Sequence, residues 1–409
     1  MPRFIKILLP LMLIVSSIIF ITACVEDEVA TNEKVVIEPF ENDLNLPARQ
    51  QVSQSNNSFC IDLFKRIDKE NENIVFSSFS VSNAMLMAGE MMNEGAAKAI
   101  RTGLKLPENI TTVREGYQSI LKAYGTENKD YKLSIANAVW IEKKESIVPE
   151  HQANIEKFYL GKALSFDNSQ PKITADLVNK WCDNNTNGMI KQILSPGDIN
   201  SNTLFILTNV IYFKGMWREK FEESRTSEML FYNSQGKEAT AKFMQTNEKF
   251  AYTENEAVQV LKMRYKGNFS MLIILPRENE INSVKNSLTS EMLTKWNENL
   301  TTYDVEVSLP KFKFEFATNL NAPLTQLGMG EAFGSGGLAI DQVMHKAIID
   351  VNEEGTEAAA VTAVTMTRSM PQEYEKREFK ADHPFIFVIQ EEMTNNILFM
   401  GKVEKPEYK

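Results

Sequence analysis

The chain has few of the residues that most catalytic and metal-binding proteins use. It contains three histidines and three cysteines in 409 residues. No His-Glu-x-x-His, paired Cys-x-x-Cys, Gly-x-Ser-x-Gly or P-loop pattern occurs in it. A hydrolase needs a nucleophile, a base and an oxyanion hole, and these cannot be assembled from the residues present. We therefore expect a protein that is not an enzyme and that binds no metal or cofactor.

The cysteines are too few for a disulfide framework. Cys60 lies in a helical apolar pattern, and Cys182 follows Trp181 in another helix-like run. Both are expected to be small buried apolar residues. A bridge between them stays open at this point.

The chain also lacks an excess of positive charge. It has 54 acidic and 44 basic residues, and its formal net charge is −10. A protein that binds a polyanion usually presents a basic groove, which this composition does not provide. We expect no nucleic-acid partner, and we interpret the acidic surplus as a contribution to solubility.

Residues 1–23 form a targeting segment with a basic start and an apolar core interrupted by Pro10. The core is too short for a retained membrane helix. Thr22-Ala23-Cys24 resembles a bacterial lipobox, which implies a lipid-modified Cys24 and a membrane anchor; a plain secretory signal is the alternative. Glu26-Asp27-Glu28 resembles the acidic export tags of Bacteroidetes surface lipoproteins. This predicts a secreted lipoprotein on the outer membrane of a Gram-negative bacterium.

Residues 24–50 are polar and acidic, which predicts a flexible acidic tether. Residues 51–409 carry a continuous pattern without a second linker, which predicts one domain. Helical spacing covers 58–70, 80–92, 96–104, 114–124, 150–159 and 171–184. Strand patterns cover 203–213, 259–265, 270–275, 305–309, 345–351, 383–390 and 397–402. The fold class is therefore α+β.

The segment 353–370 is unusual because it is long and small-chained, with neither charge nor turn formers from Ala358 to Thr367. Its start could form a helix with Thr356 as N-cap. Its β-branched residues and its period of two favour a strand instead. One side of that strand would carry Thr356, Ala358, Ala360, Thr362, Val364 and Met366. Helix and strand are evenly balanced for this segment taken alone.

Residues 353–360, Glu-Glu-Gly-Thr-Glu-Ala-Ala-Ala, resemble the hinge of an inhibitory serpin reactive loop. Six further motifs follow the order of the serpin family: residues 73–80, with Ser78 in place of the usual proline, and residues 137–140, 208–217, 309–312, 383–387 and 398–402. The resemblance covers about residues 52–405. The signal segment and the loop length are similar to those of miropin-type bacterial surface serpins.

The resemblance implies a serpin fold, with helices packed around three β-sheets and an exposed reactive centre loop. It implies a monomeric suicide inhibitor of trypsin-like and elastase-like serine proteases. The protease would cleave the loop and form a covalent acyl complex, and the loop would then insert into the central sheet and stall deacylation. The native fold would be held kinetically.

The resemblance also implies roles for individual residues. The hinge would comprise Glu353, Glu354, Gly355, Thr356, Glu357, Ala358, Ala359 and Ala360. The shutter and breach, where the sheet opens, would comprise Ser77, Ser80, Asn209, His345, Trp217 and Lys311, with Lys311 paired to Glu353. The reactive bond would lie among Thr367, Arg368, Ser369 and Met370. Family spacing indicates Ser369–Met370, whereas a trypsin-like pocket favours Arg368–Ser369.

Two alternatives differ in class. A non-inhibitory serpin would carry bulky or charged hinge residues, which Thr356–Ala360 lack apart from Glu357. A surface lipoprotein that binds glycans or a host protein would present aromatic platforms, and the loop region contains only Tyr374.

Overall fold

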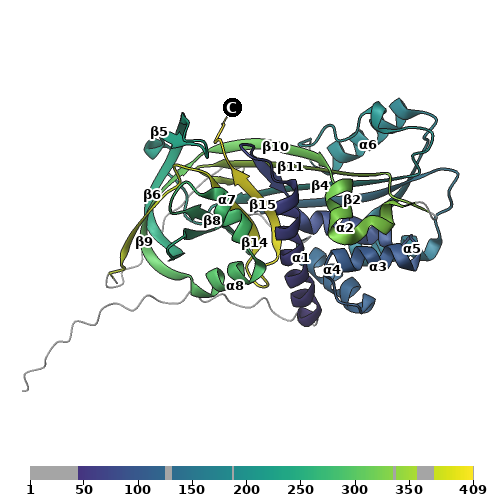
Figure 1. Ribbon diagram of the computed structural model, residues 1–409, viewed down its shortest axis with the longest axis horizontal. Coiled ribbons are helices and arrows are strands. Elements are labelled where there is room, and N and C mark those ends of the chain that lie inside the picture. Colours follow the sequence, from purple (N-terminus) through teal and green to yellow (C-terminus); the bar gives the residue numbers. More distant parts are fainter. Residues whose placement is uncertain (1–44, 125–130, 187, 335–337, 357–372, 409) are drawn as a thin grey trace, which may run out of the picture. The chain divides into compact units, whose positions relative to one another are not determined.

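The computed structural model describes residues 45–124, 131–186, 188–334, 338–356 and 373–408. Most helices gather at one end of this part of the chain, whereas α7 and α8 lie beside the strands β8 and β14 (Figure 1). They are α1 Leu46–Ile67, α2 Ser78–Gly89, α3 Glu94–Gly103, α4 Ile110–Tyr124, α5 Pro149–Tyr159, α6 Pro171–Asn185, α7 Ile281–Ser287, α8 Ser290–Asn299 and α9 Asn321–Leu324. Within these ranges, no helix combines the length and apolarity that crossing a bilayer requires.

The strands run through the middle and the opposite end of the described residues (Figure 1). They are β1 Ile74–Phe76, β2 Tyr131–Glu142, β3 Lys162–Phe166, β4 Phe205–Met216, β5 Ser227–Tyr232, β6 Glu238–Glu254, β7 Val258–Arg264, β8 Phe269–Pro276, β9 Thr301–Pro310, β10 Phe312–Asn319, β11 Gln342–Asn352, β12 Gly355–Thr356, β13 Lys376–Lys380, β14 Phe385–Glu391 and β15 Ile397–Val403. The mixed content confirms the predicted α+β class.

Hydrogen bonds join the described strands into two sheets rather than the three that were expected. A nine-stranded sheet has the order β1-β15-β14-β8-β7-β6-β9-β13, with β5 paired to β6. A six-stranded sheet has the order β10-β11-β12-β4-β2-β3. The difference arises because the long strand β6 pairs with β5 along its first part and with β7 along its last part. One strand thus merges two of the expected sheets.

The sequence explains where several helices begin. The Ser77 side chain accepts a hydrogen bond from the Ser80 backbone N–H at 3.2 Å and caps α2. Asn93 caps α3 in the same way. Pro149 and Pro171 occupy the first turns of α5 and α6, where a missing N–H costs nothing. These local signals agree with the predicted starts of the helices to within a few residues.

The boundary of α1 differs from the prediction. The helix begins at Leu46 and not at Ser58, so residues 46–50, which were assigned to the tether, are helical. Arg49 is buried and lies 3.4 Å from the carboxylate of Glu391. The first turn, Leu46-Pro47-Ala48-Arg49, is too short to give a periodic signal, and Arg49 joins it to a part of the chain that is distant in sequence.

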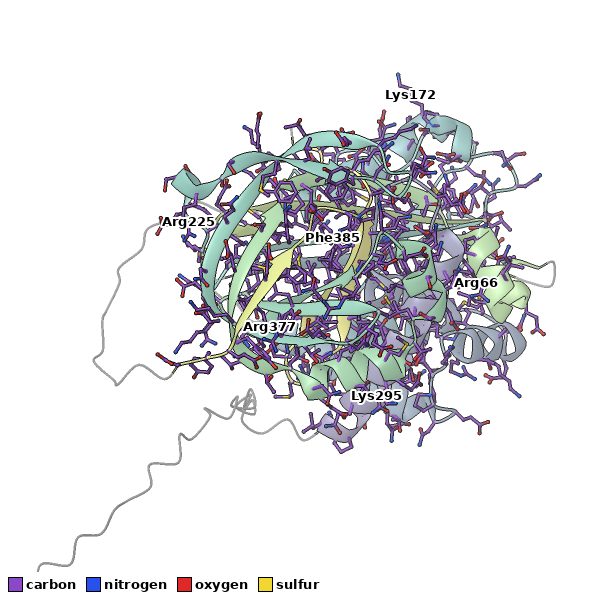
Figure 2. The ribbon with its side chains drawn as sticks, turned by 60° about the vertical axis from the view of Figure 1, so that its left-hand side comes forward. Arg66, Lys172, Arg225, Lys295, Arg377 and Phe385 are labelled. Atoms are coloured by element: carbon purple, nitrogen blue, oxygen red, sulfur yellow. The ribbon has the colours of Figure 1, made fainter. Side chains whose placement is uncertain are left out.

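The core lies between the sheets and the helices. Strands β8 and β14 are buried along their whole length, and Phe385 at the start of β14 lies in the centre of the described side chains (Figure 2). A second apolar cluster packs α6 against β2 and β4. Cys60 and Cys182 are both free and buried, as small apolar residues of these two clusters.

Candidate functional site

The six-stranded sheet contains two parallel pairings, β2 with β3 and β11 with β4, and the second of these lies next to β12. Residues 342–347 of β11 pair directly with residues 206–211 of β4 in parallel register. At the other end of the same two strands, β12 lies between them and pairs antiparallel with each. At one end of the sheet, β12 therefore separates the two strands, and we call β12 the wedge. At the other end the strands pair directly, and we call this pairing of 342–347 with 206–211 the seam.

Gly355 allows the wedge to form. Its φ of 146° lies in a region that side-chain-bearing residues rarely adopt. A Cβ atom at this position would come within 2.0 Å of the Gly215 carbonyl oxygen. Because backbone atoms of β4 cannot move aside cheaply, only glycine fits here. The structure thus resolves the helix-or-strand question in favour of a strand at Gly355 and Thr356.

Trp217, predicted for the breach, lies directly against the hinge. Its backbone N–H donates to the Glu354 carbonyl at 2.8 Å, and its indole N–H donates to the Asn352 carbonyl at 3.0 Å. The indole stacks on the Tyr265 ring at 4.3 Å. The Tyr265 hydroxyl hydrogen-bonds the Thr356 hydroxyl at 2.8 Å, and burial raises the pKa of Tyr265.

The predicted pair of Glu353 and Lys311 is formed. The Lys311 ammonium lies 2.7 Å from a Glu353 carboxylate oxygen, and the Thr226 hydroxyl donates to the other at 2.8 Å. Burial alone would raise the pKa of Glu353, but the bonds from Lys311 and Thr226 lower it below its ordinary value. Since both oxygens have partners, the first residue of the hinge is held as a charged group.

The predicted shutter residues also come together, midway along the seam. His345 on β11 pairs in register with Asn209 on β4. Its Nδ1 lies 2.6 Å from the side-chain oxygen Oδ1 of Asn209, and its Nε2 accepts a hydrogen bond from the Ser77 backbone N–H at 3.2 Å. These contacts define a neutral imidazole with its proton on Nδ1. Burial lowers the pKa of His345 to about 3, so the ring stays neutral at ordinary pH.

The network continues from Asn209 toward α2 and β2. The Asn209 amide donates to the Ser80 hydroxyl and to Asn137 Oδ1, the latter at 2.7 Å. Ser80 in turn donates to Asn137 at 3.1 Å. Since His345 and Asn209 are on the two strands of the seam, their contact is a side-chain bond across it. Separating the strands requires breaking that bond.

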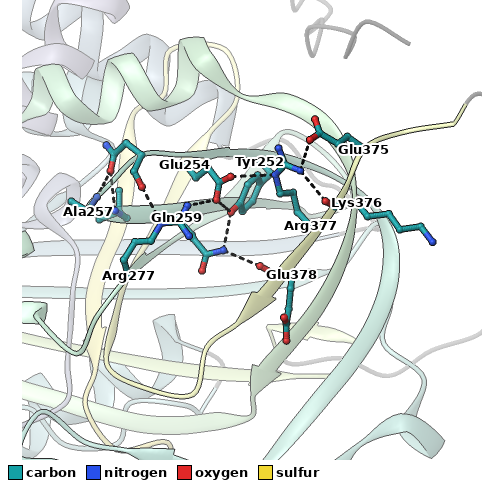
Figure 3. Close-up of polar contacts among 11 residues, drawn as sticks. Tyr252, Glu254, Ala257, Gln259, Arg277, Glu375, Lys376, Arg377 and Glu378 are labelled. Atoms are coloured by element: carbon teal, nitrogen blue, oxygen red, sulfur yellow. Dashed lines mark hydrogen bonds and ion pairs between the residues drawn. The ribbon is translucent and has the colours of Figure 1, made fainter. Parts of the chain in front are cut away.

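A second polar cluster holds the strand that follows the loop segment (Figure 3). Arg377 on β13 contacts Glu254 at the end of β6 at 3.2 Å, and Glu254 also accepts from Arg277 and from the Tyr252 hydroxyl. Gln259 donates to the Glu378 backbone carbonyl at 2.8 Å. The guanidinium of Arg377 also lies over the Tyr303 ring. Side chains from several strands therefore anchor β13, in addition to its parallel pairing with β9.

Several predicted residues lie outside the described ranges. They are the hinge residues Glu357, Ala358, Ala359 and Ala360, the reactive-bond residues Thr367, Arg368, Ser369 and Met370, and Cys24. The structure places Ser77, Ser80, Asn209 and His345 in one network and Glu353, Lys311 and Trp217 in another.

Sequence reasoning missed some members of these networks. It assigned no role to Gly215, Thr226 or Tyr265, and it used Asn137 only as part of a strand motif. Gly215, within the Lys-Gly-Met-Trp run, offers the only local signal, a glycine inside a strand pattern. The others contact the hinge or the shutter through distant pairings that no local pattern reveals.

The chain is similar to known proteins along most of its length. The family model "Serpin (serine protease inhibitor)" matches residues 54–406. An uncharacterized serpin-like protein of Methanosarcina mazei is 35% identical, and the match covers 95% of each chain. The leukocyte elastase inhibitor of Sus scrofa is 35% identical, with 87% of this chain and all of that one covered.

Solved structures agree with the sequence comparisons. Human thyroxine-binding globulin superposes with a TM-score of 0.81 at 26% identity, covering 88% of this chain and all of that one. Tengpin, a thermophilic serpin solved in the native state, superposes with a TM-score of 0.78 at 27% identity, covering 91% and 97% of the two chains.

Proposed function

Because this chain belongs to the serpin family, we propose that it is a suicide inhibitor of trypsin-like and elastase-like serine proteases. The protease attacks one bond of the reactive loop, and its serine becomes acylated by the residue before that bond. The severed loop then inserts between β11 and β4, and the displaced protease is held as the acyl-enzyme. The elastase-inhibitor relatives support this proposal at the level of the reaction.

The observation that carries the proposal is the wedge between two strands that pair in parallel beyond it. A strand that continued β12 would be antiparallel to both neighbours. The inserted strand would replace the one parallel ladder between β11 and β4 with two antiparallel ladders, one to β11 and one to β4. The described hinge already occupies the first two positions of this path.

The register of β12 sets how far insertion can run. Thr356 pairs with Gly215 on β4 and Val351 on β11. Continuing this register residue by residue brings Met366 opposite Phe205, the first residue of β4. Arg368 would then lie beside Thr203. The segment is therefore long enough to fill the slot along the whole of β4, with the cleavage region emerging just past its end.

The composition of the segment suits this path. Thr356 is buried at 2% exposure, which sets the inward side of the continuing strand. The inward residues are then Ala358, Ala360, Thr362, Val364 and Met366. Alanine is small, threonine and valine are β-branched, and methionine is flexible and unbranched. None of these side chains carries a charge whose burial would cost free energy. Thr362 would lie opposite His345 and Asn209, where its hydroxyl could replace the bond that insertion breaks.

The candidate cleavage bonds suit two classes of protease. Arg368 fits a trypsin-like pocket that holds a buried carboxylate. Thr367 and Ser369 are small and fit the narrow pocket of an elastase-like enzyme. We propose that neighbouring bonds, Arg368–Ser369 and Ser369–Met370 among them, serve different proteases.

Incubation with trypsin or elastase, followed by denaturing electrophoresis, tests the function. We expect a band at the summed mass of inhibitor and protease that survives boiling in detergent, and mass spectrometry of the released peptide identifies the cleaved bond. Cleavage without any stable adduct would refute trapping and indicate a substrate instead.

The N-terminal segment supports a location for this activity. We propose that Cys24 is acylated and that residues 25–44 tether the inhibitor to the outer surface of a Gram-negative outer membrane. Expression in such a host, with Cys24→Ala as the matched variant, tests this. We expect the native protein in the membrane fraction and accessible to added protease, and the variant in the soluble fraction. Equal distribution of the two would refute the anchor.

A further inference from the structure

A small cavity of about 80 Å³ lies beside the breach, away from the seam. Its lining includes Arg218, Lys249, Lys262 and Arg264, together with Glu219 and Thr302. A single water needs only about 10–15 Å³ of such space. The cavity therefore has room for several waters or for one small tetrahedral ion, and four of its side chains are cationic.

The cations are brought together by strand pairing. Ala251 on β6 pairs with Lys262 on β7, and the same register continued by two residues places Lys249 opposite Arg264. Like charges on opposite strands destabilise a sheet when nothing lies between them. Positive charge is thus concentrated on one face of β6 and β7 by the fold itself.

Among the described residues, ion pairs join carboxylates to two of these cations, Lys262 and Arg264. Glu392 contacts the buried Lys262 ammonium at 2.8 Å and lies 3.4 Å from Arg264 Nε. Arg264 Nη2 is buried without a hydrogen-bond acceptor in the part of the chain that the structure describes. Among those same residues, no ion pair joins a carboxylate to Arg218 or Lys249. Lys249 lies instead over the ring of Tyr374.

Two further acids face the cavity or its rim. Glu219 lines it, and burial raises the pKa of this carboxyl group. Asp304 on β9 pairs in register with Lys249 but makes no ion pair with it within the described residues. Glu219, Asp304, Glu392 and Glu248, which interacts electrostatically with Glu219, equal the four cations in number, so the feature that remains for an anion is the buried Arg264 nitrogen that lacks an acceptor among the described residues.

We propose that this cavity binds one tetrahedral oxyanion, a phosphate or sulfate group, either as the free ion or as part of a polyanionic chain. Arginine donates in a planar fork that matches such an anion, and the lysines add charge without fixing an orientation. Thr302 supplies a hydroxyl at the wall.

The position of the cavity connects it to both ends of the loop. Arg218 follows Trp217, whose N–H holds the hinge at Glu354, and the Arg218 N–H donates to the Arg264 carbonyl at 2.8 Å. Lys249 contacts Tyr374, close to where the chain returns from residues 357–372. An anion held by Arg218 and Lys249 would therefore bridge the segments that enter and leave the loop.

Binding of inorganic phosphate, measured by isothermal titration against sodium chloride of equal ionic strength, tests the site. The double variant Arg218→Ala/Lys249→Ala removes two exposed cations of the cavity. The matched control Lys172→Ala/Lys191→Ala removes the same charge from exposed positions; Figure 2 shows Lys172 on a different side of the molecule from Arg377. Circular dichroism confirms that each variant is folded.

We expect saturable binding by the native chain and the control, and at least tenfold weaker binding by the cavity variant. A sulfated oligosaccharide is titrated in parallel. If it binds at least tenfold more tightly than phosphate and shows the same loss in the cavity variant, the anion is part of a chain; if only phosphate binds, it is the free ion. The proposal is overturned if neither probe saturates, or if the control loses as much affinity as the cavity variant.

Discussion

Replacing Thr356 by arginine provides the sharpest test of loop insertion. Thr356 is the last described residue of the hinge, is 2% exposed, and hydrogen-bonds the buried Tyr265 hydroxyl at 2.8 Å. In the native state, Thr356→Arg can be accommodated if the wedge withdraws from the sheet. After cleavage, insertion would have to carry the arginine into the buried position that Thr356 occupies against the Tyr265 hydroxyl.

The magnitude follows from that environment. An uncompensated buried charge costs about 3–5 kcal/mol, and the Tyr265 hydroxyl would lose its partner for a further cost of about 1–3 kcal/mol. Taking only 3 kcal/mol as a barrier increase, insertion slows by more than about 100-fold, since about 1.4 kcal/mol is a factor of ten. Deacylation competes with insertion, so the acyl-enzyme would be hydrolysed before the protease is trapped.

The assay is a titration of trypsin with each variant, read as the ratio of stable adduct to cleaved inhibitor on a denaturing gel. We expect mainly adduct for the native chain and almost only cleaved inhibitor for Thr356→Arg. Thr240→Arg places the same side chain at an exposed position on β6 and serves as the matched control. An adduct yield for Thr356→Arg equal to that of the control would show that insertion does not pass through this position.

Three further predictions concern the loop, the shutter and β13. Arg368→Ala should reduce the trypsin inhibition rate far more than the elastase rate, because only trypsin uses the guanidinium; equal losses would refute separate bonds. Burial lowers the pKa of His345 from 6.5 to about 3, so stability should be complete above about pH 6.5 and fall by about 1.4 kcal/mol per pH unit toward pH 3. Denaturation midpoints at pH 7 and pH 5 should therefore differ less for His345→Gln, and an unchanged difference would contradict the assignment. Arg377→Ala removes the contact between β13 and Glu254. Inhibitory activity should then decline faster on incubation at 37 °C, because the uncleaved loop enters the sheet more readily when β13 is held less firmly. Arg66→Ala is the control, since Figure 2 shows Arg66 away from Arg377, and equal decay in both variants would refute the stabilising role of Arg377.

Much of the fold was predictable because its elements carry local signals. The apolar strands of 270–275 and 383–390 and the capped helix that follows Ser77 have patterns that do not depend on distant residues. The first turns of α1 were missed because Arg49 is held by Glu391, which is far away in the sequence. Strand β6 was missed altogether, because its first residues are exposed and burial does not alternate regularly along it.

The candidate site divides in the same way. The hinge could be located from its own residues, since Gly355 and the small side chains after it form a recognisable run. Tyr265 and Thr226 could not, because an isolated tyrosine or threonine in a strand-rich chain has many possible partners. The pairing of Lys311 with Glu353 came from the family resemblance, and the structure brings the two side chains together.

The parallel seam between β11 and β4 has a consequence for handling the purified protein. A backbone ladder recognises the spacing of peptide groups and not the molecule that supplies them. Any extended segment with small alternate side chains satisfies the seam equally well, including the loop of a neighbouring copy or a synthetic peptide of that sequence. Warm, concentrated solutions should therefore form larger assemblies through strand exchange between molecules, and an added peptide should compete with that process for the same place between β11 and β4.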